Sequence, residues 1–166
     1  MTSKNVLAVI GGSGLYDIPG LIDVEEVRVE TPFGPPSDAI VRGRLNDTTL
    51  LFLPRHGRGH RIAPHEIDSR ANICALKKLG ATHLVSISAV GSMKEAIAPG
   101  DFVVVDQFVD LTKRRVSTFF DEDVAAHVMF ADPVCHLMAD SLARAAEARH
   151  WRPFRTGGRS GDFGKA

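Results

Sequence analysis

The sequence predicts an α/β fold in which helices flank a mostly parallel or mixed central sheet. Three apolar runs rich in β-branched residues, at 6–10, 82–90 and 102–105, are typical of strands that are buried on both faces. Between the first two runs, from about Pro64 to Gly80, apolar residues recur at helical spacing. Apolar strands separated by a helix are typical of parallel sheets, because a parallel pair needs a long crossover.

The first half of the chain is expected to consist mainly of strands. These strands are predicted at residues 6–10, 24–30, 39–45 and 48–53. A turn rich in proline and glycine, over residues 31–37, separates the second strand from the third. The last two strands are expected to form a hairpin around Asn46-Asp47, because both residues favour tight turns.

Two helices are expected in the rest of the chain. The first begins at about Pro64, a residue that is tolerated in the first turn of a helix, and stops at Gly80. The second begins at about Pro133. Its inner face is predicted to carry six side chains: Val134, Leu137, Met138, Ser141, Leu142 and Ala145.

The composition is that of an ordinary globular protein, and it excludes several classes of partner. The 20 basic and 20 acidic residues cancel, so the net charge gives no reason to expect a nucleic-acid or anionic-membrane partner. Cys74 and Cys135 form neither a disulfide framework nor a zinc signature, and both are expected to be buried. The sequence shows no signal peptide and no run of transmembrane length, which predicts a cytoplasmic protein.

The first candidate for ligand binding is the loop Gly11-Gly-Ser-Gly14, which follows the first buried strand. Its glycines allow backbone N–H groups to converge on an anion, and Ser13 adds a hydroxyl donor. A tight turn without a ligand explains the same residues equally well. A dinucleotide-binding fingerprint is excluded, because its third glycine would fall at Asp17.

A stronger candidate is the basic segment Arg55-His-Gly-Arg-Gly-His-Arg61, with three arginines and two histidines. The arginine fork matches phosphate oxygens, and histidine supplies another donor. The segment directly follows the strand predicted at 48–53, and open α/β sheets bind ligands at the carboxyl ends of their strands. This position favours phosphate binding over a solvated basic turn. A metal site at His56, His60 and His65 is disfavoured, because the arginines repel a cation.

Two weaker candidates lie further along the chain. Small residues end the strand at 82–90, in the sequence Ser86-Ile-Ser-Ala-Val-Gly-Ser92, and allow the backbone to approach a ligand closely. A serine-rich strand end needs no ligand, however. His127 lies in an apolar stretch before the last helix, where a histidine more often has a structural role than a catalytic one.

Eight short stretches resemble the 5′-methylthioadenosine phosphorylase branch of the trimeric purine nucleoside phosphorylase family. In chain order they are IGGSGL (10–15), TPFGPPSD (31–38), PRHGRGH (54–60), ANI (71–73), SAVGS (88–92), PGD (99–101), DQFVDLT (106–112) and ADPVC (131–135). Each stretch alone is unspecific. Together they span about residues 6–150 in the order of the family, and this combination is highly specific.

The resemblance implies a nucleoside phosphorylase-like fold and the phosphorolysis of 5′-methylthioadenosine, or a related purine nucleoside, in purine and methionine salvage. In that reaction phosphate attacks the anomeric carbon and releases the free base and a sugar 1-phosphate. The resemblance implies that phosphate is bound by Ser13, Arg55, His56, Ser88 and the backbone of Ala89. It further implies a homotrimer in which His127 reaches the 5′ side of a neighbouring subunit's sugar. Neither a cofactor nor a metal is implied, because inorganic phosphate is a substrate.

The chain departs from the family pattern in its second half. The family's base-binding segment and its base-protonating aspartates are missing, so no catalytic residue is expected within the chain. We therefore expect an incomplete nucleoside phosphorylase domain at 1–156, with impaired activity. A disordered, non-family tail is expected at 157–166, because these residues lack any apolar period.

Two other functions stay open from the sequence. A histidine phosphatase also carries Arg-His-Gly after a strand and uses the histidine as nucleophile. In that family the motif ends the first strand of the fold, whereas here several strands precede it. A non-catalytic phosphate-binding remnant is favoured by the missing second half.

Overall fold

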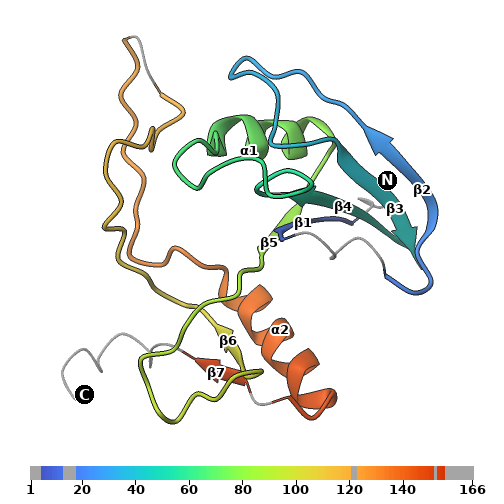
Figure 1. Ribbon diagram of the computed structural model, residues 1–166, viewed down its shortest axis with the longest axis vertical. Coiled ribbons are helices and arrows are strands. Elements are labelled where there is room, and N and C mark those ends of the chain that lie inside the picture. Colours follow the sequence, from blue (N-terminus) through green and yellow to red (C-terminus); the bar gives the residue numbers. More distant parts are fainter. Residues whose placement is uncertain (1–4, 13–17, 121–122, 152, 156–166) are drawn as a thin grey trace. The chain divides into compact units, whose positions relative to one another are not determined.

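The computed structural model describes residues 5–12, 18–120, 123–151 and 153–155, and these residues form two compact units (Figure 1). The described residues up to Ala89, together with 115–119, make the first unit. The second unit consists of 90–114 and the described residues from Phe120 onward. The tail predicted at 157–166 lies outside the described residues. Within the described part of the chain, no helix is long and apolar enough to cross a membrane.

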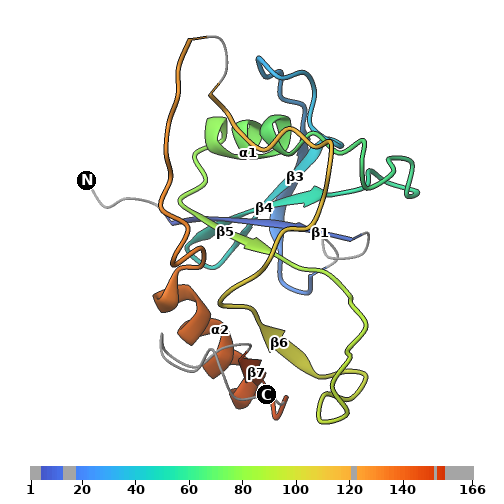
Figure 2. The same ribbon diagram turned by 90° about the vertical axis from the view of Figure 1, so that its left-hand side faces the viewer.

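The first unit is built on a five-stranded mixed sheet, which confirms the predicted α/β class. Its strands are β1 (Val6–Gly11), β2 (Ile22–Val27), β3 (Ile40–Leu45), β4 (Thr48–Pro54) and β5 (His83–Ser86). They lie in the order β2-β3-β4-β1-β5. β1 runs parallel to both of its neighbours, β4 and β5, whereas β3 pairs antiparallel with β2 and β4 (Figure 2).

The main core of this unit lies between the sheet and the helix α1 (Ser69–Lys78), which covers one face (Figure 2). Leu76 of α1 belongs to one buried cluster with Leu51 and Leu53 of β4. Leu50 and Phe52 belong to a second cluster, because successive side chains of a strand point to opposite faces. β4 is therefore buried on both faces, as its apolar sequence predicts.

The hairpin between β3 and β4 forms where it was predicted. Leu45 pairs with Thr48, and the connection is Asn46-Asp47. Asn46 has φ 51°, in the left-handed region that asparagine tolerates better than most residues. β2 covers Ile22–Val27 instead of the predicted 24–30, and its pairing with β3 is irregular at its start.

The helix α1 begins at Ser69, later than the start predicted near Pro64. The reason is its N-cap, Asp68, whose side chain accepts hydrogen bonds from two N–H groups of the first turn. Residues 63–66 form a separate turn closed by its own backbone hydrogen bond. The predicted end is confirmed, because Gly80 follows the helix with φ 86°.

The apolar run 82–90 gives a shorter strand than predicted, and the run 102–105 does not join the five-stranded sheet. β5 ends at Ser86. The strand β6 (Phe102–Val104) pairs instead with β7 (Pro153–Arg155), in a separate two-stranded parallel sheet of the second unit. This pairing is possible because the helix α2 (His136–Ala148) lies between β6 and β7 in the chain and supplies the crossover that parallel strands need.

The inner face predicted for α2 is wrong. Its buried residues are Ala139, Ala143 and Ala146, whereas Leu137 is 80% exposed and Leu142 is 39% exposed. These alanines recur at helical spacing, and their small side chains let the helix contact β6 and β7 closely. In the described residues, the leucine side of α2 is left facing solvent.

The two cysteines are less buried than predicted. Cys74 of α1 is half-buried, since the contact face of this helix is centred on Ala71, Ala75 and Leu76. Cys135 precedes α2 and is exposed. Neither cysteine therefore behaves as the small core residue that its apolar sequence context suggests.

Candidate functional site

The carboxyl ends of three strands of the first unit, β1, β4 and β5, lie side by side. β1 is parallel to β4 and β5, and the register pairs Gly11 with Pro54 and Ile10 with Ser86. Two further hydrogen bonds extend these ladders, from Arg55 N–H to the Gly11 carbonyl at 2.9 Å and from the Ile87 N–H to the Ile10 carbonyl at 2.8 Å. The residues that follow the three strands are thereby held side by side.

A cavity of about 390 Å³ lies among these strand ends. Its described lining comes from the loops after β1, β4 and β5 and consists of Gly12, Arg55, His56, His60, Ile87, Ser88 and Ala89. Glycine and alanine leave their backbone accessible here, and the polar side chains are an arginine, two histidines and a serine. This donor set suits an anion.

Arg55 links two of the strand ends. Its Nη1 donates a hydrogen bond to Ser88 Oγ at 2.5 Å, and its Nε donates to His56 Nε2 at 3.3 Å. The guanidinium group therefore lies between the end of β4 and the end of β5, with the hydroxyl of Ser88 on one side. An arginine fork in this position presents several N–H groups to one ligand.

His56 is held in one tautomer. Its Nδ1 lies 2.9 Å from the carbonyl oxygen of Ile62, so Nδ1 carries the proton and donates, while Nε2 accepts from Arg55. The ring also stacks on His60, with ring centroids 5.3 Å apart and planes at 11°. Both ring nitrogens are engaged, which disfavours His56 as the nucleophile of a histidine phosphatase.

His60 lines the cavity, although the sequence did not place it among the predicted phosphate-binding residues. The side chain reaches this position because the segment folds back on itself. Gly57, Gly59 and His60 have φ of 67°, 76° and 53°, all in the left-handed region. Gly57 and Gly59 in the sequence indicate that the segment can turn. They do not indicate that His60 stacks on His56, because this contact forms only in the folded loop.

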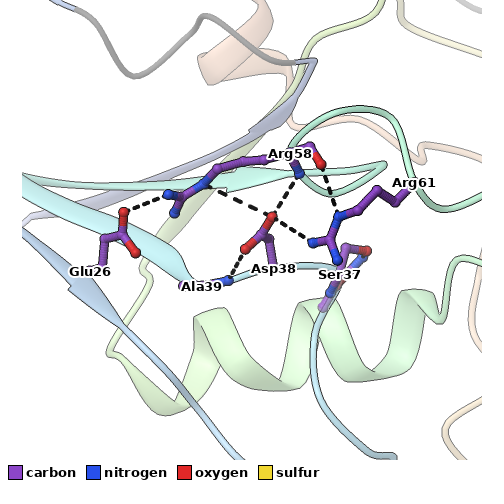
Figure 3. Close-up of polar contacts among 7 residues, drawn as sticks. Glu26, Ser37, Asp38, Ala39, Arg58 and Arg61 are labelled. Atoms are coloured by element: carbon purple, nitrogen blue, oxygen red, sulfur yellow. Dashed lines mark hydrogen bonds and ion pairs between the residues drawn. The ribbon is translucent and has the colours of Figure 1, made fainter.

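The other two arginines of the basic segment do not line the cavity. Figure 3 shows the acidic side chains that they contact instead. Arg58 donates to Glu26 Oε1 at 2.6 Å, and Arg61 lies 3.4 Å from Asp38 Oδ2. The prediction that treated all three arginines as one phosphate-binding cluster is therefore too broad. One arginine lines the cavity, and two pair with acidic side chains.

These pairings change the titration of both acids. The hydrogen bond from the Arg58 guanidinium lowers the pKa of Glu26 below its ordinary value. For Asp38, partial burial raises the pKa. Hydrogen bonds from the N–H groups of Arg58 and Ala39, with the charges of Arg58 and Arg61, outweigh that effect and leave the pKa of Asp38 lowered.

Arg55, His56, Ser88 and Ala89, four of the six residues predicted to bind substrate, line this cavity. Ser13 lies outside the described residues. His127 belongs to the second unit, and its side chain is exposed. Among the described residues, no group of three or more potential metal-ligating side chains comes together.

A second hollow in the first unit, of about 490 Å³, offers no comparable chemistry. It is lined by Phe33, Ile73, Cys74, Lys77, Lys78 and Phe119. The rings of Phe33 and Phe119 meet edge to face, with centroids 5.5 Å apart. Apart from two lysines and a cysteine this described lining is apolar, and it holds no arginine, histidine or hydroxyl group, so the cavity at the strand ends is the candidate site.

Comparison with known proteins identifies the family. The sequence model described as the phosphorylase superfamily matches residues 6–159. The chain belongs to this superfamily. The superfamily match includes every described residue of the cavity at the strand ends.

Several phosphorylases of this superfamily are close relatives of the chain. The S-methyl-5′-thioadenosine phosphorylase of Geobacter sulfurreducens is 56% identical over 147 residues, which are 87% of this chain and 51% of that protein. The protein of the same name from Hyperthermus butylicus is 55% identical over 146 residues, 87% of this chain and 53% of that protein. The chain thus spans about half the length of these curated relatives.

Solved structures of the superfamily share the fold. A methylthioadenosine phosphorylase from an Antarctic soil metagenomic library matches with a TM-score of 0.88 and 49% identity, over 92% of this chain and 54% of that one. The methylthioadenosine phosphorylase of Schistosoma mansoni in complex with adenine matches with a TM-score of 0.81 and 42% identity. That match covers 88% of this chain and 55% of the Schistosoma chain. The nucleoside phosphorylase fold expected from the sequence is confirmed for this part of the protein.

Proposed function

We propose that this phosphorylase acts in the phosphorolysis of 5′-methylthioadenosine, or of a related purine nucleoside, and that the present chain supplies the phosphate-binding half of the site. The supporting observation is that Arg55, His56, Ser88 and Ala89 line one cavity at the carboxyl ends of parallel strands. The names of the close relatives support the choice of nucleoside.

In the proposed reaction, a phosphate oxygen forms a bond to the anomeric carbon as the bond from that carbon to the purine nitrogen breaks. The electron pair of the broken bond leaves with the base, which takes up a proton, and the products are the free purine and a sugar 1-phosphate. Positive charge develops on the ribose in the transition state, and a correctly oriented phosphate anion stabilises it.

We assign the binding and orientation of phosphate to several residues of the chain. Arg55 would bind two phosphate oxygens with its fork, and the Ser88 hydroxyl and Ala89 N–H would bind others. Ser13 is proposed as a further hydroxyl donor. His56 would act on the anion through Arg55, because its Nε2 accepts a hydrogen bond from Arg55 Nε and orients the guanidinium. These groups orient phosphate and do not form a covalent intermediate, and no cofactor is proposed.

We propose that the 166-residue chain by itself binds phosphate but turns over substrate poorly. The purine must be protonated as it leaves, and the aspartates that the family resemblance implies for this step are missing from the chain. Loss of general-acid assistance commonly lowers a rate by ~10²–10⁴. A purely phosphate-binding role is the second candidate, since the chain spans about half the length of its relatives.

The full-length assembly is proposed to be a cytoplasmic homotrimer, in which His127 reaches the 5′ side of a neighbouring subunit's substrate. This proposal rests on the resemblance of residues 31–38, residues 106–112 and His127 to the methylthioadenosine branch. Its test is cross-subunit complementation in a full-length relative. A trimer mixed from subunits inactivated at the position of Arg55 and subunits inactivated at the position of His127 should recover activity.

Calorimetric titration with inorganic phosphate, followed by an assay for adenine release from methylthioadenosine, tests the main proposal. Saturable phosphate binding that is lost in Arg55→Met, with turnover far below the usual 1–10³ s⁻¹, is expected. Arg44→Met is the matched control, because Arg44 is an exposed arginine of β3 that pairs with Asp23 away from the cavity. If phosphate binds equally to the wild type and to Arg55→Met, the proposed site is wrong.

A further inference from the structure

We propose that Asp38, which lies outside the cavity lining, is a positioning residue that holds the loop 55–62 so that Arg55 and His56 face the phosphate. The inference rests on the proposed function and deepens it. Asp38 precedes β3 and belongs to a different part of the sequence from the loop that it contacts (Figure 3). Phosphate itself is bound by other residues.

The loop needs an external support because its conformation is unusual. Residues with positive φ, including the non-glycine His60 at 53°, cost conformational energy unless their surroundings hold them. Within the loop, backbone hydrogen bonds run from Gly57 to Pro54, from His60 to Gly57 and from Ile62 to His56, at 3.0–3.2 Å. The Arg58 N–H instead donates to a side chain from another segment, Asp38 Oδ2, at 2.7 Å.

Asp38 makes several contacts to the loop from a nearly buried position. Its side chain is only 12% exposed. Oδ1 accepts from the Ala39 N–H at 2.8 Å, which fixes the carboxylate to the segment that precedes β3. Oδ2 lies 3.4 Å from Arg61 Nη2, and Arg61 Nε donates to the Arg58 carbonyl at 2.9 Å. The carboxylate thus contacts both Arg58 and Arg61 on the side of the loop that follows His56.

The segment that carries Asp38 is itself fixed to the core. The preceding residue, Ser37, is hydrogen-bonded through its N–H and its hydroxyl to Asn72, a residue of α1 that is 2% exposed. Gly57 approaches the same segment so closely that a Cβ on it would lie 3.1 Å from the Ser37 carbonyl oxygen. The loop is therefore packed against a rigid support and not merely linked to it by charge.

The same contacts determine which arginines of the basic segment pair with acids and which one lines the cavity. Asp38 and Glu26 pair with Arg58 and Arg61, which are thereby held away from the anion. Arg55 is the arginine of the segment that lines the cavity. Removing the carboxylate of Asp38 would loosen the loop and take away the acid that pairs with the Arg61 guanidinium, whereas Arg58 would keep its bond to Glu26. The site would then change although no residue that lines it had been replaced.

The test is to replace Asp38 by asparagine, which keeps the size of the side chain and removes its charge. Three properties of the full 166-residue chain are measured: affinity for inorganic phosphate, amide exchange at His60 and Ile62, and the ¹⁵N shifts of the His56 ring. Asp23→Asn is the matched control, because it removes an exposed acid that pairs with Arg44, and asparagine tolerates the φ of 54° at that position.

In Asp38→Asn we expect phosphate affinity to fall on the order of tenfold, the loss that goes with weakening a charge-assisted hydrogen bond. Amide exchange should become faster at His60 and Ile62, whose N–H groups donate within the loop to Gly57 and His56, and the His56 ring should lose its fixed tautomer. Asp38→Glu should recover part of the affinity. If Asp38→Asn does not fold, Arg61→Met takes its place, with a smaller loss expected, because Arg61 is 67% exposed.

The outcomes separate this inference from the proposed function. Phosphate affinity and loop exchange that match the wild type in Asp38→Asn would overturn the positioning role while leaving the phosphate site intact. A wild-type chain that binds no phosphate would overturn the proposed function, and with it any role for Asp38 in phosphate binding. Equal losses in Asp23→Asn would also count against the inference, because they would show a general response to removing an acid from the sheet.

Discussion

Asn72 and Ser37 exchange two hydrogen bonds across 35 residues of sequence, and these bonds tie α1 to the segment that precedes β3. Asn72 Oδ1 accepts from the Ser37 N–H at 2.8 Å, and its Nδ2 donates to Ser37 Oγ at 2.9 Å. Asn72 is 2% exposed and sits on the same helix face as Ala75 and Leu76. A buried amide with both ends satisfied makes the position of this segment specific.

Replacing Asn72 by alanine should therefore lower the free energy of unfolding by about 1–3 kcal/mol, because the Ser37 N–H loses its acceptor in a partly buried place. Urea denaturation followed by circular dichroism measures this change. Ser37→Ala removes the hydroxyl and keeps the N–H bond, so its effect should be smaller. An equal or larger loss in Ser37→Ala would show that the backbone bond is not the important one.

Replacing Arg55 by lysine should weaken phosphate binding on the order of tenfold or more, although the charge is kept. A lysine presents a point charge, whereas the arginine fork donates to Ser88 and to the anion together. Calorimetric titration with inorganic phosphate measures the change, with Arg42→Lys on β3 as the control. Equal affinity in the Arg55 and Arg42 variants would mean that net charge alone attracts the anion.

The lowered pKa of Asp38 predicts how stability changes with acid. A carboxyl whose pKa is lower in the folded state stabilises the fold above its ordinary pKa, near 3.8, and loses this contribution as the pH falls through the lower value. The free energy of unfolding should thus differ between wild type and Asp38→Asn at pH 6 and converge in strong acid. Urea titrations at several pH values test this, and a difference that grows in acid contradicts it.

The isolated chain should self-associate through the β5 edge of the sheet. Leu84 and Ile87 are 43% and 40% exposed at this edge. At the opposite edge β2 also exposes Ile22 and Val24, but its acidic residues Asp23 and Glu25 lie between and beside them and pair with arginines of β3. An apolar sheet edge favours pairing between chains, and charged side chains oppose it. Size-exclusion chromatography should show concentration-dependent oligomers.

A substitution at each edge locates the contact. Leu84→Lys should shift the chain toward the monomer, because it places a charge on the β5 edge. Val24→Lys, at an exposed position of β2, should leave the association unchanged. A chain that is monodisperse and monomeric at all concentrations would refute the prediction.

Much of the first unit could be predicted from sequence because its signals are local. Apolar runs indicated β1 and β4, and Asn46-Asp47 indicated the hairpin. The start of α1 was missed because of a local feature, the N-cap Asp68, whereas the error at α2 has its cause in tertiary packing. The leucines of α2 gave the stronger periodic signal, but the helix buries its alanines, since small side chains allow close contact with β6 and β7. Periodicity cannot tell which of two apolar faces is used.

The candidate site was predictable as a set of strand ends but not as an arrangement of side chains. The position of Arg55 and His56 after β4 indicated that they belong to the carboxyl edge of the sheet. The sequence of the basic segment could not show that Arg55 lines the cavity while Arg58 does not. Arg58 points away because it pairs with Glu26 on β2. Such long-range pairings leave no periodic trace in the sequence.

The described lining of the cavity comes entirely from residues 12–89. A ribosome makes the chain from its N-terminus, and compact units generally fold in that order. The pairing of β1 with β5 brings the last wall of the cavity into place, so the cavity can form on the growing polypeptide before the second unit is made. On the proposed function, phosphate that binds this cavity would stabilise the nascent first unit by mass action, before it serves as a substrate.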